Sequence, residues 1–262
     1  MEIVVLVKQV PDTNAPAEVA GAALSGEPAD IPWTINPHDE MAVEEALRVK
    51  EAHGGRVTLL SFSRPEEFDA LRIGIAMGAD RAVAIIDELK STSRYRDGLL
   101  LSRIFAAALK TMRFDLIIAG QKAVDDDAGV VGPALAEKLN LPFFSMVVGQ
   151  EISGNRVRCK RLVGGGRMEV EAPLPALLLA TRGLNRPRYA TMPGLRRATR
   201  QGVETWRLRD IAPDAQHLFC DQPSRLIALE PVESQRDLTM ARGDSPREKA
   251  EALARYLLSD QG

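Results

Sequence analysis

The chain has 262 residues, of which 45% are hydrophobic and 27% charged, and 34 Lys and Arg against 36 Asp and Glu leave a net charge of −2. This length supports one substantial core, with or without an appended arm, and the composition is globular rather than disordered. Because the balanced charge creates no global field for polyanions and only 5% of the residues are aromatic, nucleic acid is not an expected partner.

The cysteines and the amino terminus indicate the compartment. Cys159 and Cys220 form no Cys-x-x-Cys motif, so neither a metal knuckle nor a dithiol redox pair is expected. The apolar run at residues 3–7 is short and soon gives way to polar sequence, which fits neither a signal peptide nor a transmembrane segment. We therefore expect reduced thiols and a cytoplasmic location.

Strands and helices are predicted to alternate through the first half of the chain. Residues 3–7 form a β-branched run typical of a strand buried on both faces. A helix is predicted over 40–50, because Asn36 and Asp39 precede an acidic first turn and can satisfy its free N–H groups. The alternation continues with strands over 56–62, 81–86 and 115–119 and with helices over 65–77 and 97–111.

The pattern changes after a further helix that is predicted to end at Leu139. Alternating residues on both sides of Gly164, Gly165 and Gly166 predict an antiparallel hairpin, since no helix follows these glycines as a phosphate loop would require. The remaining elements are a buried strand over 175–181, a proline-interrupted loop over 182–197, an ambiguous stretch over 206–211 and an amphipathic helix over 245–258. Together the elements predict an α/β fold: a doubly wound, mostly parallel sheet with a small antiparallel hairpin and a C-terminal arm.

The stretch from Gly120 to Val131 lies between a predicted strand and a predicted helix. Its small residues let backbone N–H groups approach a phosphate, and the next helix adds its positive N-terminal end. Asp125, Asp126 and Asp127 would repel a bare phosphate, so they must face solvent, bind a metal, cap N–H groups or accept hydrogen bonds from a ribose or base. A solvated acidic turn and a ligand loop both fit, whereas adjacent side chains rarely converge on Mg²⁺.

No catalytic constellation is evident. The chain has no Gly-x-x-x-x-Gly-Lys-Ser/Thr sequence for phosphoryl transfer. His38, His53 and His217 are scattered, without a metal-binding pair or a nucleophilic serine motif. Hydrolytic, zinc-dependent and P-loop chemistry are therefore not expected.

The basic loop over 182–197 is either a solvated connector or a docking surface. Met192 lies beside Leu195 among arginines, and an unbranched methionine adapts to different pockets while the charges steer encounter. The candidate docking residues are Tyr189, Met192, Pro193, Leu195, Arg196 and Arg197.

Five motifs, in order along residues 1–200, resemble the β subunit of electron-transferring flavoproteins. They are KQVPDT at 8–13, INP at 35–37 with AVEEA at 42–46, AMGAD at 76–80, the Asp-rich loop, and LN at 184–185 with PRYAT at 187–191. The last sixty or so residues match the family more weakly.

The resemblance implies a sheet of the adenine-nucleotide-binding type in the small subunit of a heterodimer whose larger subunit holds the working FAD. Such a protein shuttles electrons between dehydrogenases, such as acyl-CoA dehydrogenases, and a quinone-linked membrane oxidoreductase or another acceptor. It is an electron carrier rather than an enzyme with its own catalytic residues, because the flavin carries the chemistry. Residues 1–220 would form the nucleotide-binding domain, and 221–262 an arm and helix that contact the larger subunit.

In many relatives the small subunit binds AMP. Carried over by position, the cofactor-binding residues are Leu6, Asn36, Pro37, His38, Asp39, Phe62, Gly120, Gln121, Lys122, Ala123, Val124, Asp125, Asp126, Asp127, Ala128, Gly129, Val130 and Val131. Met192 takes the place of the leucine that anchors dehydrogenase partners in the family.

The departures from the family pattern concern the occupant. AMP-binding relatives commonly carry Asn-Gln-Thr where this chain has Gly129, Val130 and Val131. Two stretches, 131–133 and 8–13, are closer to the electron-bifurcating branch, whose small subunit binds a second FAD and takes hydride from NADH. The Asp-Gly-Asp-Thr-Ala-Gln of that branch is absent, and this chain has Asp125, Asp126, Asp127, Ala128, Gly129 and Val130 there. We expect AMP, with a second FAD as the alternative. Two interpretations come from other functional classes: a stand-alone adenine-nucleotide sensor or enzyme, and a scaffold that binds no ligand.

Overall fold

The computed structural model describes residues 1–12, 14–15, 31–64, 67–86, 96–212, 224, 227–228 and 240–259. The chain divides into two compact units, Met1–Leu229 and Glu230–Gly262. The second unit contains α9 (Pro246–Ser259), which confirms the helix predicted over 245–258. None of the described helices has the length and apolar character needed to cross a membrane.

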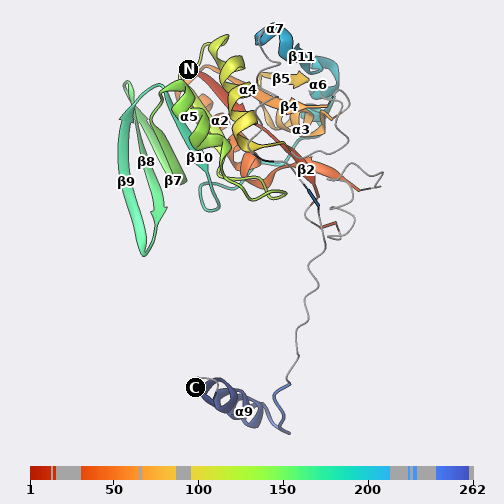
Figure 1. The fold of residues 1–262 in the computed structure, drawn as a ribbon, viewed down its shortest axis with the longest axis vertical. Coiled ribbons are helices and arrows are strands. Elements are labelled where there is room, and N and C mark those ends of the chain that lie inside the picture. Colours follow the sequence, from red (N-terminus) through yellow and green to blue (C-terminus); the bar gives the residue numbers. More distant parts are fainter. Residues whose placement is uncertain are drawn as a thin grey trace. The chain divides into compact units, whose positions relative to one another are not determined.

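Within the described residues, the first unit is built on a nine-stranded sheet with the order β11-β5-β4-β1-β6-β10-β7-β8-β9 (Figure 1). Neighbours from β11 to β7 are parallel, and β7, β8 and β9 pair antiparallel. The strands are β1 (Glu2–Leu6), β4 (Arg56–Ser63), β5 (Arg81–Ile86), β6 (Leu116–Gly120), β7 (Phe143–Ser153), β8 (Arg156–Val163), β9 (Gly166–Pro173), β10 (Ala176–Ala180) and β11 (Glu204–Arg207). The predicted α/β fold and its hairpin are confirmed.

Helices cover both faces of this sheet. In β1, Ile3 and Val5 pack into one apolar cluster while Val4 and Leu6 pack into another, as expected for a strand whose side chains alternate between two buried faces. The helices on the Ile3 face are α2 (Pro37–His53), α3 (Asp69–Met77) and α6 (Met192–Gln201), and those on the Val4 face are α4 (Gly98–Lys110), α5 (Val131–Leu139) and α7 (Leu208–Ile211).

The strand order places a crevice beside β1. From β1 the chain builds outward through β4 and β5, and then crosses to β6 and β10 on the other side. A small separate sheet pairs β2 (Gln9–Pro11) with β3 (Trp33–Ile35), just after the end of β1. Parallel sheets bind ligands at the carboxyl ends of strands where the order reverses, which here is between β1 and β6.

Several element boundaries differ from the predictions. Helix α2 begins at Pro37 rather than at residue 40, because a proline in the first turn lacks only an N–H group that the helix would leave unpaired. Helix α3 begins at Asp69 rather than at residue 65, and residues 65–66 lie outside the described part. Strand β7 was not predicted, because its burial does not alternate and its register shifts between Val147 and Gly149. The ambiguous residues 206–211 end β11 and form α7.

The prediction that 182–197 contains no regular element was wrong. Helix α6 begins at Met192, and the Thr191 side chain caps it by accepting a hydrogen bond from the Gly194 N–H at 3.1 Å. Pro193 lies in the first turn, where it is tolerated. Proline and glycine are typical of loops as well as of helix starts, so the two residues alone do not distinguish these structures.

Gly194 brings α6 into direct contact with α3. A Cβ atom at this position would lie 2.1 Å from the Ala76 carbonyl oxygen. We expect Gly194→Ala to push α6 away from α3, to lower the free energy of unfolding by about 1–3 kcal/mol and to speed amide hydrogen exchange in α6. Gly164→Ala is the matched control, because nothing lies within 4 Å of a Cβ there. Unchanged exchange in α6 would contradict the prediction.

Candidate functional site

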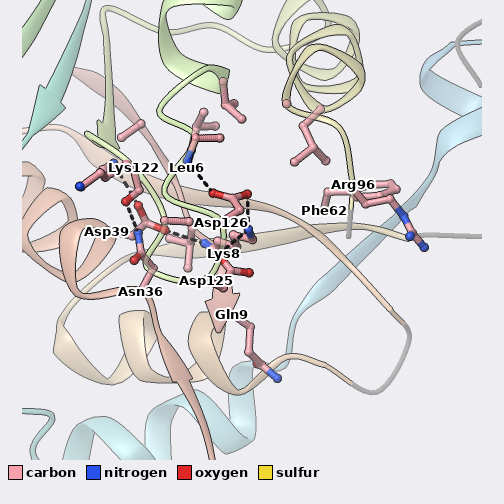
Figure 2. Close-up of a pocket in the computed structure, with 18 of the residues that line it drawn as sticks. Leu6, Lys8, Gln9, Asn36, Asp39, Phe62, Arg96, Lys122, Asp125 and Asp126 are labelled. Atoms are coloured by element: carbon pink, nitrogen blue, oxygen red, sulfur yellow. Dashed lines mark hydrogen bonds and ion pairs between the residues drawn. The ribbon is translucent and has the colours of Figure 1, made fainter. Parts of the chain in front are cut away.

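A solvent-open cleft lies at the carboxyl ends of β1, β4 and β6. The turn between β6 and α5 and the first residues of α4 and α5 complete its walls. Phe62 and Arg96 lie toward one end, Asn36 and Asp39 toward the other, and Lys8 lies between them (Figure 2). The cleft therefore occupies the place where the strand order predicts ligand binding.

The structure brings most of the proposed cofactor-binding residues into this one cleft. Those that line it are Leu6, Asn36, Asp39, Phe62, Gly120, Gln121, Lys122, Ala123, Asp125, Asp126, Ala128, Gly129, Val130 and Val131. Pro37, His38, Val124 and Asp127 are not part of its lining. His38 is buried, and its Nδ1 atom has no hydrogen-bond partner among the described residues.

The expected helix-capping role of Asn36 is replaced by another contact. Its side chain makes no capping hydrogen bond to α2. The amide instead holds the β6–α5 turn: Nδ2 donates to the Lys122 carbonyl at 3.0 Å, and Oδ1 accepts from the Val124 N–H at 3.2 Å. The position of Asn36 near a helix start predicted a contact within that helix. In the structure, both its amide nitrogen and its amide oxygen instead contact backbone groups more than eighty residues further along the chain.

Asp39 joins the ends of the two strands that flank the crevice. Its carboxylate accepts a hydrogen bond from the Lys8 N–H at 2.8 Å and another from the Gly120 N–H at 3.0 Å. A Cβ at Gly120 would lie 2.2 Å from Asp39 Oδ1, so only glycine allows this approach. Burial raises the pKa of the Asp39 carboxyl to about 7, although the two N–H donors and the Lys8 charge act to lower it.

The three consecutive aspartates are all ion-paired. Lys8 Nζ lies 2.7 Å from Asp125 Oδ1 and 3.0 Å from Asp126 Oδ2, and Lys122 Nζ lies 2.6 Å from Asp127. Asp126 also accepts a hydrogen bond from the Ala128 N–H at 3.1 Å. The described residues contain no cluster of three or more His, Cys, Asp or Glu side chains that could hold a metal ion.

The start of α5 opens on the cleft without a side-chain cap. Val130 is its N-cap residue, and Val130, Val131 and Gly132 all line the cleft. Gly129 turns the chain into the helix with a φ of +61°, a left-handed conformation that glycine adopts without strain. Uncapped N–H groups at a positive helix end favour an anion.

A comparison with known families decides what kind of protein this is. The electron transfer flavoprotein domain matches residues 27–211, which is most of the chain. The chain belongs to the electron transfer flavoprotein family.

The similar proteins carry the name of one subunit of that family. Electron transfer flavoprotein subunit beta of Bacillus subtilis is 32% identical over 263 residues, or 99% of this chain and 98% of the relative. The protein of the same name from Clostridium acetobutylicum is 37% identical over 220 residues, or 83% of each chain. Protein FixA of Azotobacter vinelandii is 29% identical over 268 residues, or 99% of this chain and 95% of the relative. The resemblance to an electron transfer flavoprotein β subunit is thereby confirmed, and such a subunit pairs with an α subunit in a heterodimer.

The docking residues that the resemblance suggested lie on and beside α6 of this electron transfer flavoprotein subunit. Tyr189, Met192 and Leu195 are 93%, 66% and 42% exposed. The Arg197 guanidinium donates to the carbonyl groups of Ile75 in α3 and of Ala79 just after α3. It therefore anchors α6 rather than facing solvent freely.

Sequence reasoning missed part of the cleft wall. These residues come from the β4–α3 connection, from the start of α4 and from β3, and they include Trp33, Arg64, Glu67, Arg96, Gly98, Leu101 and Phe105. Lys8 was noticed only as part of a motif. Their position in the sequence could have identified Lys8 and Arg64 as cleft residues, because both closely follow the carboxyl ends of central strands.

The buried Asp39 carboxyl predicts a pH-dependent stability. Its pKa is about 7 in the folded chain and about 3.9 in an unfolded chain, so between these values only the folded chain keeps the proton. The free energy of unfolding should therefore fall as the pH rises through this window, by up to about 4 kcal/mol. Urea unfolding of wild type and Asp39→Asn across the window should give a difference that changes with pH. A constant difference would mean that the N–H donors keep Asp39 ionised throughout.

Proposed function

We propose that this subunit binds AMP in the cleft, and that the heterodimer carries electrons between dehydrogenases, such as acyl-CoA dehydrogenases, and a quinone-linked or other acceptor. The observation that carries the proposal is the cleft itself, which gathers the β1 end, the β4 end and the β6–α5 turn around one space. The working FAD would belong to the larger subunit, with electrons passing through the flavin and no catalytic residue supplied by this chain.

The chemistry of the cleft walls suits the parts of an adenosine phosphate. Leu6, Phe62 and Leu101 provide apolar surface for a flat base. The uncapped start of α5 provides backbone donors for a phosphate. Because Val130 and Val131 bring no polar side chains, the backbone would have to hold the phosphate by itself. That arrangement supports a nucleotide bound mainly for structural purposes.

A second FAD in place of AMP, with NADH as the electron donor, is the alternative. The cleft continues past Phe62 to Arg64, Glu67 and Arg96, which leaves room for a ligand longer than a mononucleotide. A stand-alone adenine-nucleotide sensor or enzyme is the alternative from another class. Such a protein would purify as a stable monomer that hydrolyses nucleotide.

Two further surfaces would contact other proteins. Helix α6 presents Met192 and Leu195 beside arginines, which suits docking to an apolar pocket with an acidic rim on a dehydrogenase. In the second unit, Leu257 and Leu258 of α9 are 61% and 78% exposed, which suits contact with the larger subunit. We propose that residues 221–262 serve as this partner-binding arm.

The identity of the bound nucleotide can be measured directly. The chain would be co-purified with its larger subunit and denatured in acid, and the released small molecules would be separated and quantified. We expect one FAD and one AMP per heterodimer. Two FAD molecules and no AMP per heterodimer would favour the electron-bifurcating alternative over the AMP proposal. A single FAD with no other adenine nucleotide would refute nucleotide binding by this subunit.

The docking role of α6 predicts a selective loss of coupling. Met192→Ala removes most of an exposed apolar side chain, so we expect a several-fold slower reduction of the flavin by the partner dehydrogenase with unchanged flavin content. Met168→Ala, on the exposed side of β9, is the matched control because that methionine is 48% exposed and distant in sequence from α6. Equal reduction kinetics for both variants and wild type would discard the idea.

A further inference from the structure

We propose that Lys8 is the residue that makes the acidic turn compatible with a phosphate: its ammonium group neutralises Asp125 and Asp126 inside the cleft. This inference rests on the proposed nucleotide binding and adds a specificity-determining residue to it. Without Lys8, two uncompensated carboxylates would share the cleft with the anion. The chain would then keep its affinity for an adenosine base and ribose but lose its affinity for the phosphorylated form.

The geometry places Lys8 at the junction of the strand end and the turn. Its Nζ atom bridges the two carboxylates, at 2.7 Å from Asp125 Oδ1 and 3.0 Å from Asp126 Oδ2 (Figure 2). The Asp125 side chain is only 9% exposed and the Asp126 side chain 22%, so solvent screens their charges incompletely. All three residues line the same cleft as the uncapped start of α5.

Among the described residues no other cation is paired with Asp125 or Asp126, although Arg64 and Arg96 also line the cleft. Lys122, the other lysine of the cleft, pairs with Asp127 at 2.6 Å, and the Asp127 side chain is 66% exposed. Among the described residues, Lys8 is thus the cation paired with Asp125 and Asp126. Burial acts to lower the pKa of the Lys8 ammonium, but the two carboxylates outweigh burial and raise it, so Lys8 stays charged at physiological pH.

The shape of the turn and its charge depend on different residues. Asn36 holds the turn backbone through the Lys122 carbonyl and the Val124 N–H, and Asp126 accepts a hydrogen bond from the Ala128 N–H. None of these contacts involves the Lys8 side chain. Replacing Lys8 should therefore change the electrostatic field of the cleft more than the path of the turn.

The test compares two ligands that differ only in the phosphate. The heterodimer, stripped of nucleotide, would be titrated with AMP and with adenosine by calorimetry. We expect Lys8→Met to weaken AMP binding by about 10- to 100-fold, because an unpaired carboxylate close to an anion in a partly screened site has an effect of this order. Adenosine affinity should change by less than about threefold, and this ligand also reports that the cleft is still folded.

Two further variants control the interpretation. Lys50→Met removes a lysine of similar exposure that pairs with Asp80 at 2.6 Å outside the cleft, so neither ligand should be affected. Adding Asp125→Asn and Asp126→Asn to Lys8→Met removes the uncompensated charge and should restore AMP binding. If FAD occupies the cleft in the wild type, AMP and adenosine remain the matched pair, because one half of FAD is AMP.

The outcomes separate this inference from the proposed function. Equal loss of AMP and adenosine binding in Lys8→Met would show that Lys8 only supports the structure, and failure of the triple variant to recover would show the same. A wild-type heterodimer whose cleft binds none of AMP, adenosine and FAD would instead refute nucleotide binding by the cleft, whatever Lys8 does.

Discussion

The candidate site depends on the two hydrogen bonds that the buried Asp39 carboxylate accepts from the Lys8 and Gly120 N–H groups. These bonds join α2 to the ends of β1 and β6, the strands between which the chain reverses its direction of growth. The contact requires glycine at position 120, because a Cβ there would collide with the carboxylate. The acidic turn and the start of α5 follow Gly120 directly in the chain, and Asn36 of the same helix start holds that turn.

Helix α2 also connects the cleft to the segment that precedes α6. Its first turn carries Asp39, and its buried middle carries Glu44, which accepts a hydrogen bond from Arg188 Nε at 2.8 Å. Glu45 accepts one from Asn185 Nδ2, also at 2.8 Å. Two motifs that lie about 140 residues apart in the sequence are thus in direct contact. A single helix therefore holds both the proposed nucleotide site and the base of the proposed docking surface.

The predictions made from the sequence succeeded where a periodic pattern carried the signal. The β-branched runs of β1, β4 and β5 were located to within one or two residues, and the hairpin of β8 and β9 was recognised from its glycines. Helix α6 was missed because Pro193 and Gly194 are also typical of loops, and the Thr191 cap that distinguishes a helix start was not weighed. Strand β7 was missed because its irregular burial lacks a period of two.

The sequence by itself determined the alternation of strands and helices, the family and the turn around which a ligand site would form, because these depend on local periodicity and on ordered motifs. Only the tertiary structure decided what the charged side chains do. Asn36 holds a turn instead of capping its helix, Lys8 pairs with two of the three aspartates, and Arg197 donates to the carbonyl groups of Ile75 and Ala79, in and just after α3. Each of these contacts joins residues more than eighty positions apart, and a side chain chooses among distant partners only when the folded backbone has brought them within hydrogen-bonding distance.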